Sequence, residues 1–328
     1  FIPIVYTYTE ESSASGKHML KVSILSVQKH IPSAAIQVLY HGANDTAFRN
    51  WLLRRKITIH DHKPTWREKV EKLRLNGDPL GSHLYAHTGN YFGTWQRIDL
   101  PKYISAEYCL LLDADTVVVS PFSFADFGLN LTATLGFSAE MDLSTTEPVN
   151  AGVAVLNIPY LRRTLQEFQT FIFNHDTPQF RLGPSDQGAY RDFYQQNLTF
   201  LDVKFNVKPY YPHWSIWKDR KIIHFHGMKP HDIVNYWFGG ECSVAIAPLC
   251  RDFRLQPFLC RSLQHFARAA AGDGPSLIHD YCHEHFSGGM TVVLMCVDFF
   301  DTLQAQPEAS SSCDAPLAEA IKRQGLSA

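Results

Sequence analysis

The sequence predicts an α/β fold with a mostly parallel sheet flanked by helices. Strand-like and helix-like segments alternate up to about residue 240, and the apolar run Tyr108–Leu112 has the composition of a buried strand. The chain has 328 residues, 45% hydrophobic and 19% charged, which is enough for a substantial core. Its formal net charge of −2 gives no electrostatic reason to expect a nucleic acid or an anionic membrane as a partner.

Each element follows from its own local pattern. Apolar spacing of three and four residues predicts helices, and alternating or β-branched runs predict strands. Before Tyr108 the predicted strands are 1–8, 36–41 and 56–62, and the predicted helices are 17–30, 46–55, 66–75 and 91–104, the last broken at Pro101. After Leu112 the predicted strands are 116–119, 150–158, 198–206 and 221–227, and the predicted helices are 159–173 and 185–195, the second capped by Ser185 or Asp186.

The alternation ends near residue 240, which predicts one domain over 1–240 and a C-terminal extension over 241–328. The extension contains an amphipathic helix at 255–270 and has the composition of a flexible linker after about residue 303. Six of the seven cysteines lie in it: Cys242, Cys250, Cys260, Cys282, Cys296 and Cys313. They could form up to three disulfides in an oxidising lumen, or stay free or bind metal in a cytosol. The segment 279–286 (HDYCHEHF) suggests zinc, but it lacks paired C-x₂-C spacing.

Two aspartates, Asp113 and Asp115, directly follow the apolar run. Buried carboxylates so close together repel each other, and a divalent cation such as Mg²⁺ or Mn²⁺ would remove that conflict. A metal at the end of a parallel strand is well placed to meet a diphosphate. The alternative is a solvated Asp-Ala-Asp turn after an edge strand.

Five motifs occur in one order: TWQRIDLP, LLLDADTVVVSPF, NAGVAVLN, SDQGAY and IIHFHGMKP. Together they resemble glycosyltransferase family 8, the glycogenin-like and galactosyltransferase-like enzymes, over roughly residues 1–235. The resemblance implies a GT-A fold, Mn²⁺ (or Mg²⁺) as cofactor and a UDP-sugar as donor. It also implies a retaining hexosyltransferase that moves the sugar to an acceptor hydroxyl.

The resemblance also implies roles for individual residues. The implied metal ligands are Asp113, Asp115 and His224. The implied UDP-sugar-binding residues are Thr7, Thr9, Arg97, Asp113, Ala114, Asp115, Asn150, Ala151, Gly152, Gly227 and Lys229. The implied catalytic residues are Asp142, Asp186 and Gln187. Two competitors stay open: Glu140 for the role of Asp142, and His226, which strand alternation places on the same face as His224.

The chain departs from the family pattern at two places. Lys229 comes two residues after Gly227 instead of three, and His231 stands where the family has tryptophan. Glu10 and Glu11 follow the first strand where the family has asparagine and tyrosine, so the nucleobase contacts are the least defined.

Two other functions fit parts of the sequence: a catalytically silent module that binds a sugar nucleotide or glycan, and a metal-dependent phosphohydrolase. The donor could be UDP-glucose, UDP-galactose, UDP-xylose or UDP-GlcNAc. The aromatic loop 210–217 could stack on an acceptor sugar or serve packing.

The compartment is open on sequence alone. Three N-glycosylation sequons, at Asn44, Asn130 and Asn197, favour the secretory pathway, with the Golgi lumen as the expectation and the cytoplasm as the alternative. No apolar run reaches the roughly 18 residues of a membrane span. We therefore expect a membrane attachment only through an anchor that precedes Phe1.

Overall fold

The computed structural model describes residues 2–12, 14–77, 88–128, 135–138, 150–242, 246–286, 290–307 and 313–323. The chain forms two compact units that interleave along the sequence. The first unit comprises Phe1–Ser13, Ser33–Ala114 and Phe122–Val203, and the second comprises Ala14–Pro32, Asp115–Pro121 and Lys204–Ala328. The predicted boundary near residue 240 stays a prediction.

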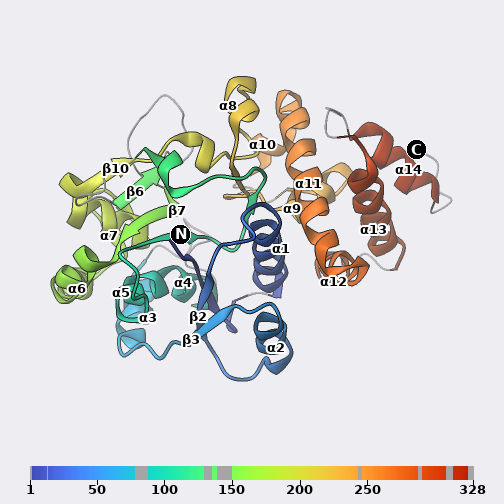
Figure 1. Cartoon of the computed structure of the whole chain (residues 1–328). Coiled ribbons are helices and arrows are strands. Elements are labelled where there is room, and N and C mark those ends of the chain that lie inside the picture. Colours follow the sequence, from blue (N-terminus) through green and yellow to red (C-terminus); the bar gives the residue numbers. More distant parts are fainter. Residues whose placement is uncertain are drawn as a thin grey trace. The chain divides into compact units, whose positions relative to one another are not determined.

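A seven-stranded sheet forms the centre of the first unit, in the order β10-β6-β7-β4-β1-β2-β3 (Figure 1). Its strands are β1 (Ile4–Thr9), β2 (Ile36–His41), β3 (Thr58–Asp61), β4 (Tyr108–Leu112), β6 (Leu135–Ser138), β7 (Asn150–Asn157) and β10 (Leu198–Phe200). All pairs are parallel except those of β7, which runs antiparallel to both β4 and β6. The predicted mostly parallel sheet is therefore confirmed.

Helices flank this sheet, and one apolar cluster joins its strands to most of them. They are α2 (Thr46–Arg54), α3 (Arg67–Leu75), α4 (Thr88–Trp95), α5 (Leu100–Tyr103), α6 (Ile158–Phe173) and α7 (Ser185–Tyr194), with a short hairpin of β8 (Gln179–Phe180) and β9 (Gly183–Pro184). Short 3₁₀ turns are η2 (Gln96–Asp99), η3 (Phe124–Phe127) and η4 (Gln195–Asn197). Strand residues such as Leu111 pack in one cluster with Trp95, Phe168 and Tyr190 from the helices.

The helix predicted over 91–104 is broken earlier than expected. α4 ends at Trp95 and η2 follows at once, so the break lies before Arg97 and not at Pro101. Pro101 instead lies in the first turn of α5, where its missing N–H costs no helical hydrogen bond. This tight turn buries Arg97.

Other predictions differ in extent. The strand predicted over 198–206 stops at Phe200, and the strand predicted over 221–227 is only β11 (Ile222–His224). β11 pairs antiparallel with β5 (Thr116–Val118) in a separate two-stranded sheet. Neither Ser185 nor Asp186 caps α7, because the helix already begins at Ser185 and Pro184 is its N-cap residue.

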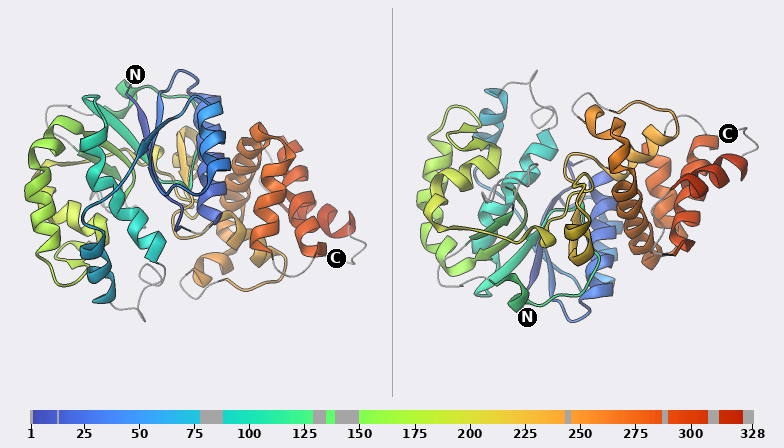
Figure 2. Two further views of the ribbon diagram at one scale, coloured as in Figure 1. Left: turned by 90° about the horizontal axis from the view of Figure 1, so that it is seen from below. Right: turned by 90° about the horizontal axis from the view of Figure 1, so that it is seen from above.

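The second unit is mainly helical outside this small sheet. Its helices are α1 (Ala14–His30), α8 (Trp214–Asp219), α9 (Pro230–Trp237), α10 (Ala247–Arg251), α11 (Gln256–Ala270), α12 (Pro275–His285), α13 (Met290–Ala305) and α14 (Asp314–Arg323). Short 3₁₀ turns are η5 (Val203–Phe205), η6 (Phe253–Leu255) and η7 (Ala271–Asp273). Helices α11 to α14, orange to red in Figure 2, lie side by side, and Phe266 of α11 contacts Tyr281 and Phe300.

All six cysteines of the extension are paired, as Cys242–Cys250, Cys260–Cys313 and Cys282–Cys296. Cys282 is therefore not a zinc ligand, and the zinc interpretation of 279–286 is wrong. Cys313, which is bonded to Cys260 of α11, lies in the predicted linker. Residues 308–312 of that linker fall outside the described part of the chain. None of the described helices is both long and apolar enough to cross a membrane.

Candidate active site

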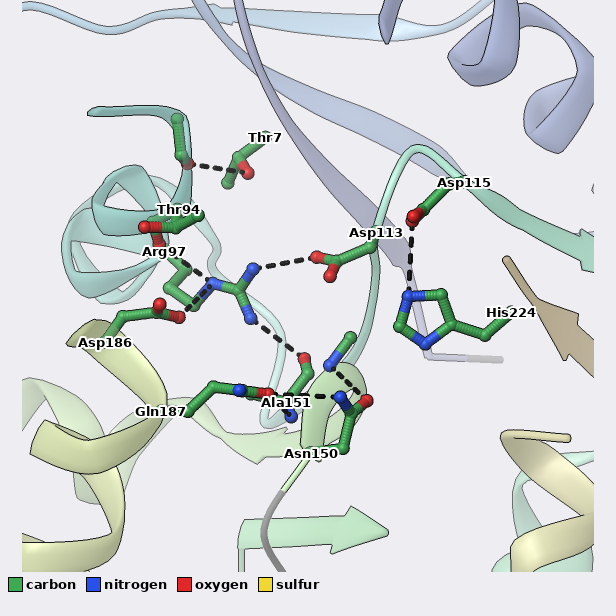
Figure 3. Close-up of polar contacts among 12 residues, drawn as sticks. Thr7, Thr94, Arg97, Asp113, Asp115, Asn150, Ala151, Asp186, Gln187 and His224 are labelled. Atoms are coloured by element: carbon green, nitrogen blue, oxygen red, sulfur yellow. Dashed lines mark hydrogen bonds and ion pairs between the residues drawn. The ribbon is translucent and has the colours of Figure 1, made fainter. Parts of the chain in front are cut away.

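The first unit brings together motifs from four elements around the buried guanidinium of Arg97. Its Nη2 donates to Asp113 Oδ1 (2.8 Å), its Nη1 donates to the carbonyl of Ala151 (2.9 Å), and its Nε donates to the carbonyl of Thr94 (3.0 Å). Nε also lies 3.2 Å from Asp186 Oδ2 as an ion pair. Figure 3 shows the guanidinium with Asp113 and Asp186 on opposite sides.

Local backbone structure positions both carboxylates. Asp113 follows β4 directly, and its N–H continues the β4–β7 ladder by donating to the carbonyl of Gly152 (2.7 Å). Asp186 is the second residue of α7 and follows Ser185, whose φ of 58° lies in the left-handed region that disfavours non-glycine residues. Strain of this kind collects at functional sites, because the surrounding structure must hold it.

Burial and neighbouring charges shift the pKa values of both Asp186 and Arg97. Burial raises the pKa of the Asp186 carboxyl, Arg97 opposes that effect, and the charge of Asp113 adds to it, so that the pKa stays above its usual range. Burial opposes the charge of Arg97, but Asp113 and Asp186 outweigh this and keep its pKa above the ordinary value. Arg97 thus stays cationic and holds two carboxylates in place.

The NAG and DQ motifs are hydrogen-bonded to each other. Gln187 Oε1 accepts from Asn150 Nδ2 (3.2 Å) and from the N–H of Ala151 (3.0 Å), and Asn150 Oδ1 accepts from the N–H of Gly152 (3.1 Å). Figure 3 shows this contact beside the Arg97 cluster. Seven of the predicted site residues therefore share one region of the first unit: Arg97, Asp113, Asn150, Ala151, Gly152, Asp186 and Gln187.

The predicted nucleobase residues lie on β1 and contact protein groups. Thr7 Oγ1 donates weakly to the carbonyl of Gly93 (3.5 Å). Thr9 is buried, and its Oγ1 lies 3.3 Å from His41 Nδ1. Glu10, at the family's asparagine or tyrosine position, accepts hydrogen bonds from Tyr40 and from the backbone of Asn44 and Asp45. Glu10 therefore holds the loop between β2 and α2 in place through hydrogen bonds.

The second unit holds the remaining predicted ligands. The register pairs Thr116 of β5 with His224 of β11, and the N–H of Phe225 donates to the carbonyl of Asp115 (2.9 Å). His224 is 1% exposed, and its Nε2 lies 3.3 Å from Asp115 Oδ1. The pairing of β5 with β11 thus fixes the imidazole against the carboxylate (Figure 3).

Lys229 neutralises Asp115 in this structure. Its Nζ forms a short ion pair with Asp115 Oδ2 and donates to the carbonyl of Phe225 (2.9 Å). Burial alone would raise the pKa of the Asp115 carboxyl, but Lys229 and His224 outweigh it and hold the pKa far below its usual range. Asp115 is therefore ionised, as a metal ligand must be.

His224 and His226 make different side-chain contacts at the end of β11. The strand stops at His224, so regular strand alternation does not extend to His226, although the two rings lie close, with centroids 5.4 Å apart. His226 Nδ1 lies 3.0 Å from the hydroxyl of Tyr210, while His224 faces Asp115. Gly227 follows with a φ of 72°, which explains why glycine occupies this position.

Asp113, Asp115 and His224 are the three side chains that could hold a metal in the described part of the chain. Asp113 belongs to the first unit and Asp115 to the second, but only Ala114 separates them, which limits their Cα atoms to roughly 7 Å apart. Two carboxylates and one neutral imidazole form a donor set that suits Mn²⁺. The residues present therefore fit the implied ion.

Some predicted residues remain untested or were missed. Asp142 and its competitor Glu140 lie outside the described residues. Asn206, which is fully buried and contacts His224 Nδ1, has no local sequence signal that would have identified it. In the loop 210–217, Tyr210, Tyr211 and Trp217 are buried and serve packing, whereas Trp214 is 48% exposed.

No protein-family model and no curated protein matches the chain. Solved structures do match it. An active-site mutant of LgtC gives a TM-score of 0.53 at 18% identity, over 70% of this chain and 89% of that one. The galactosyltransferase LgtC in complex with donor and acceptor sugar analogues gives 0.52 at 20% identity, over the same shares. The chain has the GT-A glycosyltransferase fold.

A third matching structure, of a different protein, supports the same GT-A fold. The apo form of the glycosyltransferase GlyE from Streptococcus pneumoniae TIGR4 gives a TM-score of 0.51 at 14% identity, over 79% of this chain and 62% of that one. The predicted fold class is thus confirmed. At these identities the matches establish the GT-A fold and leave the reaction to be inferred from the site.

Proposed function

We propose that the chain is a metal-dependent glycosyltransferase of family 8, which moves a hexose or related sugar from a UDP-sugar to an acceptor hydroxyl with retention of configuration. The observation that carries the proposal is the position of Asp113 at the end of β4, next to the bonded NAG and DQ motifs, in a GT-A fold. Ligands of open α/β sheets bind at the carboxyl ends of strands.

In this proposal Asp113, Asp115 and His224 hold Mn²⁺ or Mg²⁺. The bound ion would offset the negative charge that builds on the departing diphosphate. Lys229, already beside Asp115, would bind phosphate as a point charge, and Gly227 would let the backbone approach it.

The residues of the first unit would serve the sugar. Asp186 and Gln187 would lie beside the anomeric carbon, where Arg97 keeps Asp186 in position. Asn150 and Gly152 would contact sugar hydroxyls, and Thr7 and Thr9 would contact the base. The acceptor hydroxyl would then attack from the face of the leaving diphosphate, which would itself take the proton.

The test is UDP release from a panel of UDP-glucose, UDP-galactose, UDP-xylose and UDP-GlcNAc, with Mn²⁺, Mg²⁺ or a chelator. We expect release from one donor that needs the metal and is lost in Asp115→Asn and Asp186→Ala. Asp61→Asn is the matched control, because Asp61 is exposed and pairs only with Arg49 among the described ion pairs. Binding without turnover would indicate the silent module, and nucleotide monophosphate as product would indicate the phosphohydrolase.

We also propose that the protein acts in the secretory pathway, in the Golgi lumen. Three disulfides support this, because disulfides persist in oxidising compartments. Asn44, in an exposed sequon, provides the test. A glycan that glycosidase removes, and that Asn44→Gln lacks, would place the chain in the lumen, and no glycan at Asn44 or Asn197 would favour the cytoplasm.

A further inference from the structure

Asn206 is a fully buried amide that touches one of the proposed metal ligands. Its Oδ1 lies 2.9 Å from His224 Nδ1, and both residues belong to the second unit. An amide oxygen can only accept a hydrogen bond, so the partner nitrogen must carry the proton. Nε2 is then the ring nitrogen whose lone pair could bind a metal.

The backbone holds this contact rigidly. Val207, the next residue, forms a parallel bridge with Ile223, and its N–H donates to the carbonyl of Ile222 (3.0 Å). The N–H of His224 donates to the carbonyl of Val207 (2.8 Å). This short ladder holds the backbones of Asn206 and His224 side by side, and turning the imidazole would break its contact with Asn206 Oδ1.

The second ring nitrogen of His224, Nε2, lies on the side of Asp115. With the proton on Nδ1, the Nε2 lone pair faces the ionised carboxylate of Asp115 at 3.3 Å. In this structure Lys229 supplies the positive charge beside that carboxylate, and a bound cation would take over this role. A divalent ion could bind both His224 Nε2 and the Asp115 carboxylate.

We propose that Asn206 is a positioning residue that fixes His224 in the Nδ1–H tautomer, and so presents Nε2 as a metal ligand. This inference rests on the proposed function, and it names a residue that no motif identified. Hydrogen bonds from outside the ligand set commonly fix the tautomer of a metal-binding histidine, and their loss typically costs about 10–100-fold in metal affinity.

The first experiment needs no metal. Histidine-selective ¹⁵N NMR of the metal-free protein at pH 8, with the signal assigned through its loss in His224→Gln, reports which ring nitrogen is protonated. We expect a proton on Nδ1 in the native protein and in Asn206→Asp, whose carboxylate also accepts. A proton on Nε2 in the native protein would overturn the proposal, whether or not any variant folds.

The second experiment measures Mn²⁺ affinity by electron paramagnetic resonance of the free ion, without nucleotide. We expect Asn206→Leu to weaken binding by about 10–100-fold, and Asn206→Asp to restore it. The control is Asn157→Leu, which removes another buried asparagine that caps α6 by accepting from the N–H of Tyr160. It should cost stability and leave Mn²⁺ affinity unchanged.

The outcomes separate the two levels of inference. Native protein that binds no Mn²⁺ would reject the metal role in the proposed function. If the native protein binds Mn²⁺ and Asn206→Leu binds it equally tightly, the role of Asn206 is rejected and the metal role stands.

Discussion

Arg97 and Asp113 form a 2.8 Å ion pair in which the arginine side chain is 5% exposed and the aspartate side chain is 31% exposed. The same guanidinium holds Asp186, whose side chain is also 5% exposed. Arg97 therefore links the end of β4 to the start of α7. Its role in the folded protein is first to neutralise two carboxylates, before any ligand arrives.

Replacing Arg97 with methionine should strongly destabilise the first unit. The change leaves Asp186 buried without its cation, and breaking a buried pair in this way typically costs about 3–5 kcal/mol. Chemical denaturation should show this loss, with part of it recovered in the double variant Arg97→Met/Asp186→Asn. Arg74→Met, which breaks a more exposed pair with Glu71, should cost less than about 1 kcal/mol. Equal losses at both arginines would contradict this account.

Lys229→Met should change metal and nucleotide binding in opposite directions. The ammonium of Lys229 now neutralises Asp115, so its removal should tighten binding of Mn²⁺ alone. Repulsion between two unit charges in water is about 1 kcal/mol, which corresponds to a gain in Mn²⁺ affinity of at least about fivefold. UDP binding should weaken, because a phosphate partner is lost. Calorimetric titration of each ligand separately measures both effects. Weaker Mn²⁺ binding in Lys229→Met would show that the lysine does not compete with the metal.

Stability should fall in mild acid because several histidines of the second unit have lowered pKa values, among them His18, His265 and a stacked pair. The rings of His231 and His285 are parallel, with centroids 3.8 Å apart. Burial lowers the pKa of His231 to about 4, and burial with the nearby His231 lowers that of His285 to about 3.

The sign follows from which state takes up protons. At pH values between the histidine pKa in the folded protein and the pKa near 6.5 in the unfolded chain, the unfolded chain binds more protons. The contribution of these histidines to stability is therefore fully present above about pH 6.5 and is lost as the pH falls below it. Each histidine should contribute about 1.4 kcal/mol per pH unit. The free energy of unfolding in urea, measured from pH 7 to pH 5, should fall with this slope. The slope should be smaller in His285→Phe and unchanged in His283→Phe, the control at an exposed histidine. An unaltered slope in His285→Phe would exclude the stack as its source.

The disulfides should differ in their contribution according to the loops they close. Cys260 and Cys313 are 53 residues apart, and Cys242 and Cys250 are 8 apart. Loop entropy predicts losses of about 4 and about 2.5 kcal/mol when each pair is changed to serine. Denaturant midpoints of the two double-serine variants test this order, and a larger loss for Cys242/Cys250 would reverse it.

The sequence pattern predicted those parts of the site that depend on short-range order. The apolar run before Asp113 is such a local signal, whereas Arg97 and Asp186 were implied by the resemblance to a family. These three residues meet in the first unit. The direction of β7 was not predictable, because apolar periodicity is the same in parallel and antiparallel strands.

Other features depend on contacts between distant segments. β11 ends at His224 because its partner β5 is short, and nothing in the residues 221–227 marks that end. Asn206 acts on a histidine 18 positions away through a hydrogen bond that only tertiary structure creates. The helices α12 and α13 were missed because their apolar residues lack a clean helical period. Helix α14 was missed because it follows the Ser-rich segment that has the composition of a linker.

The three disulfides leave Cys109 as the single free thiol of the chain, and it is fully buried in β4. Burial raises the pKa of this thiol, which further suppresses its reaction while the sheet is closed. A thiol reagent would therefore label the native protein only when β4 is transiently exposed. The rate of labelling would measure how often the sheet opens at β4, the strand that ends next to Asp113. Bound ligand should slow this labelling.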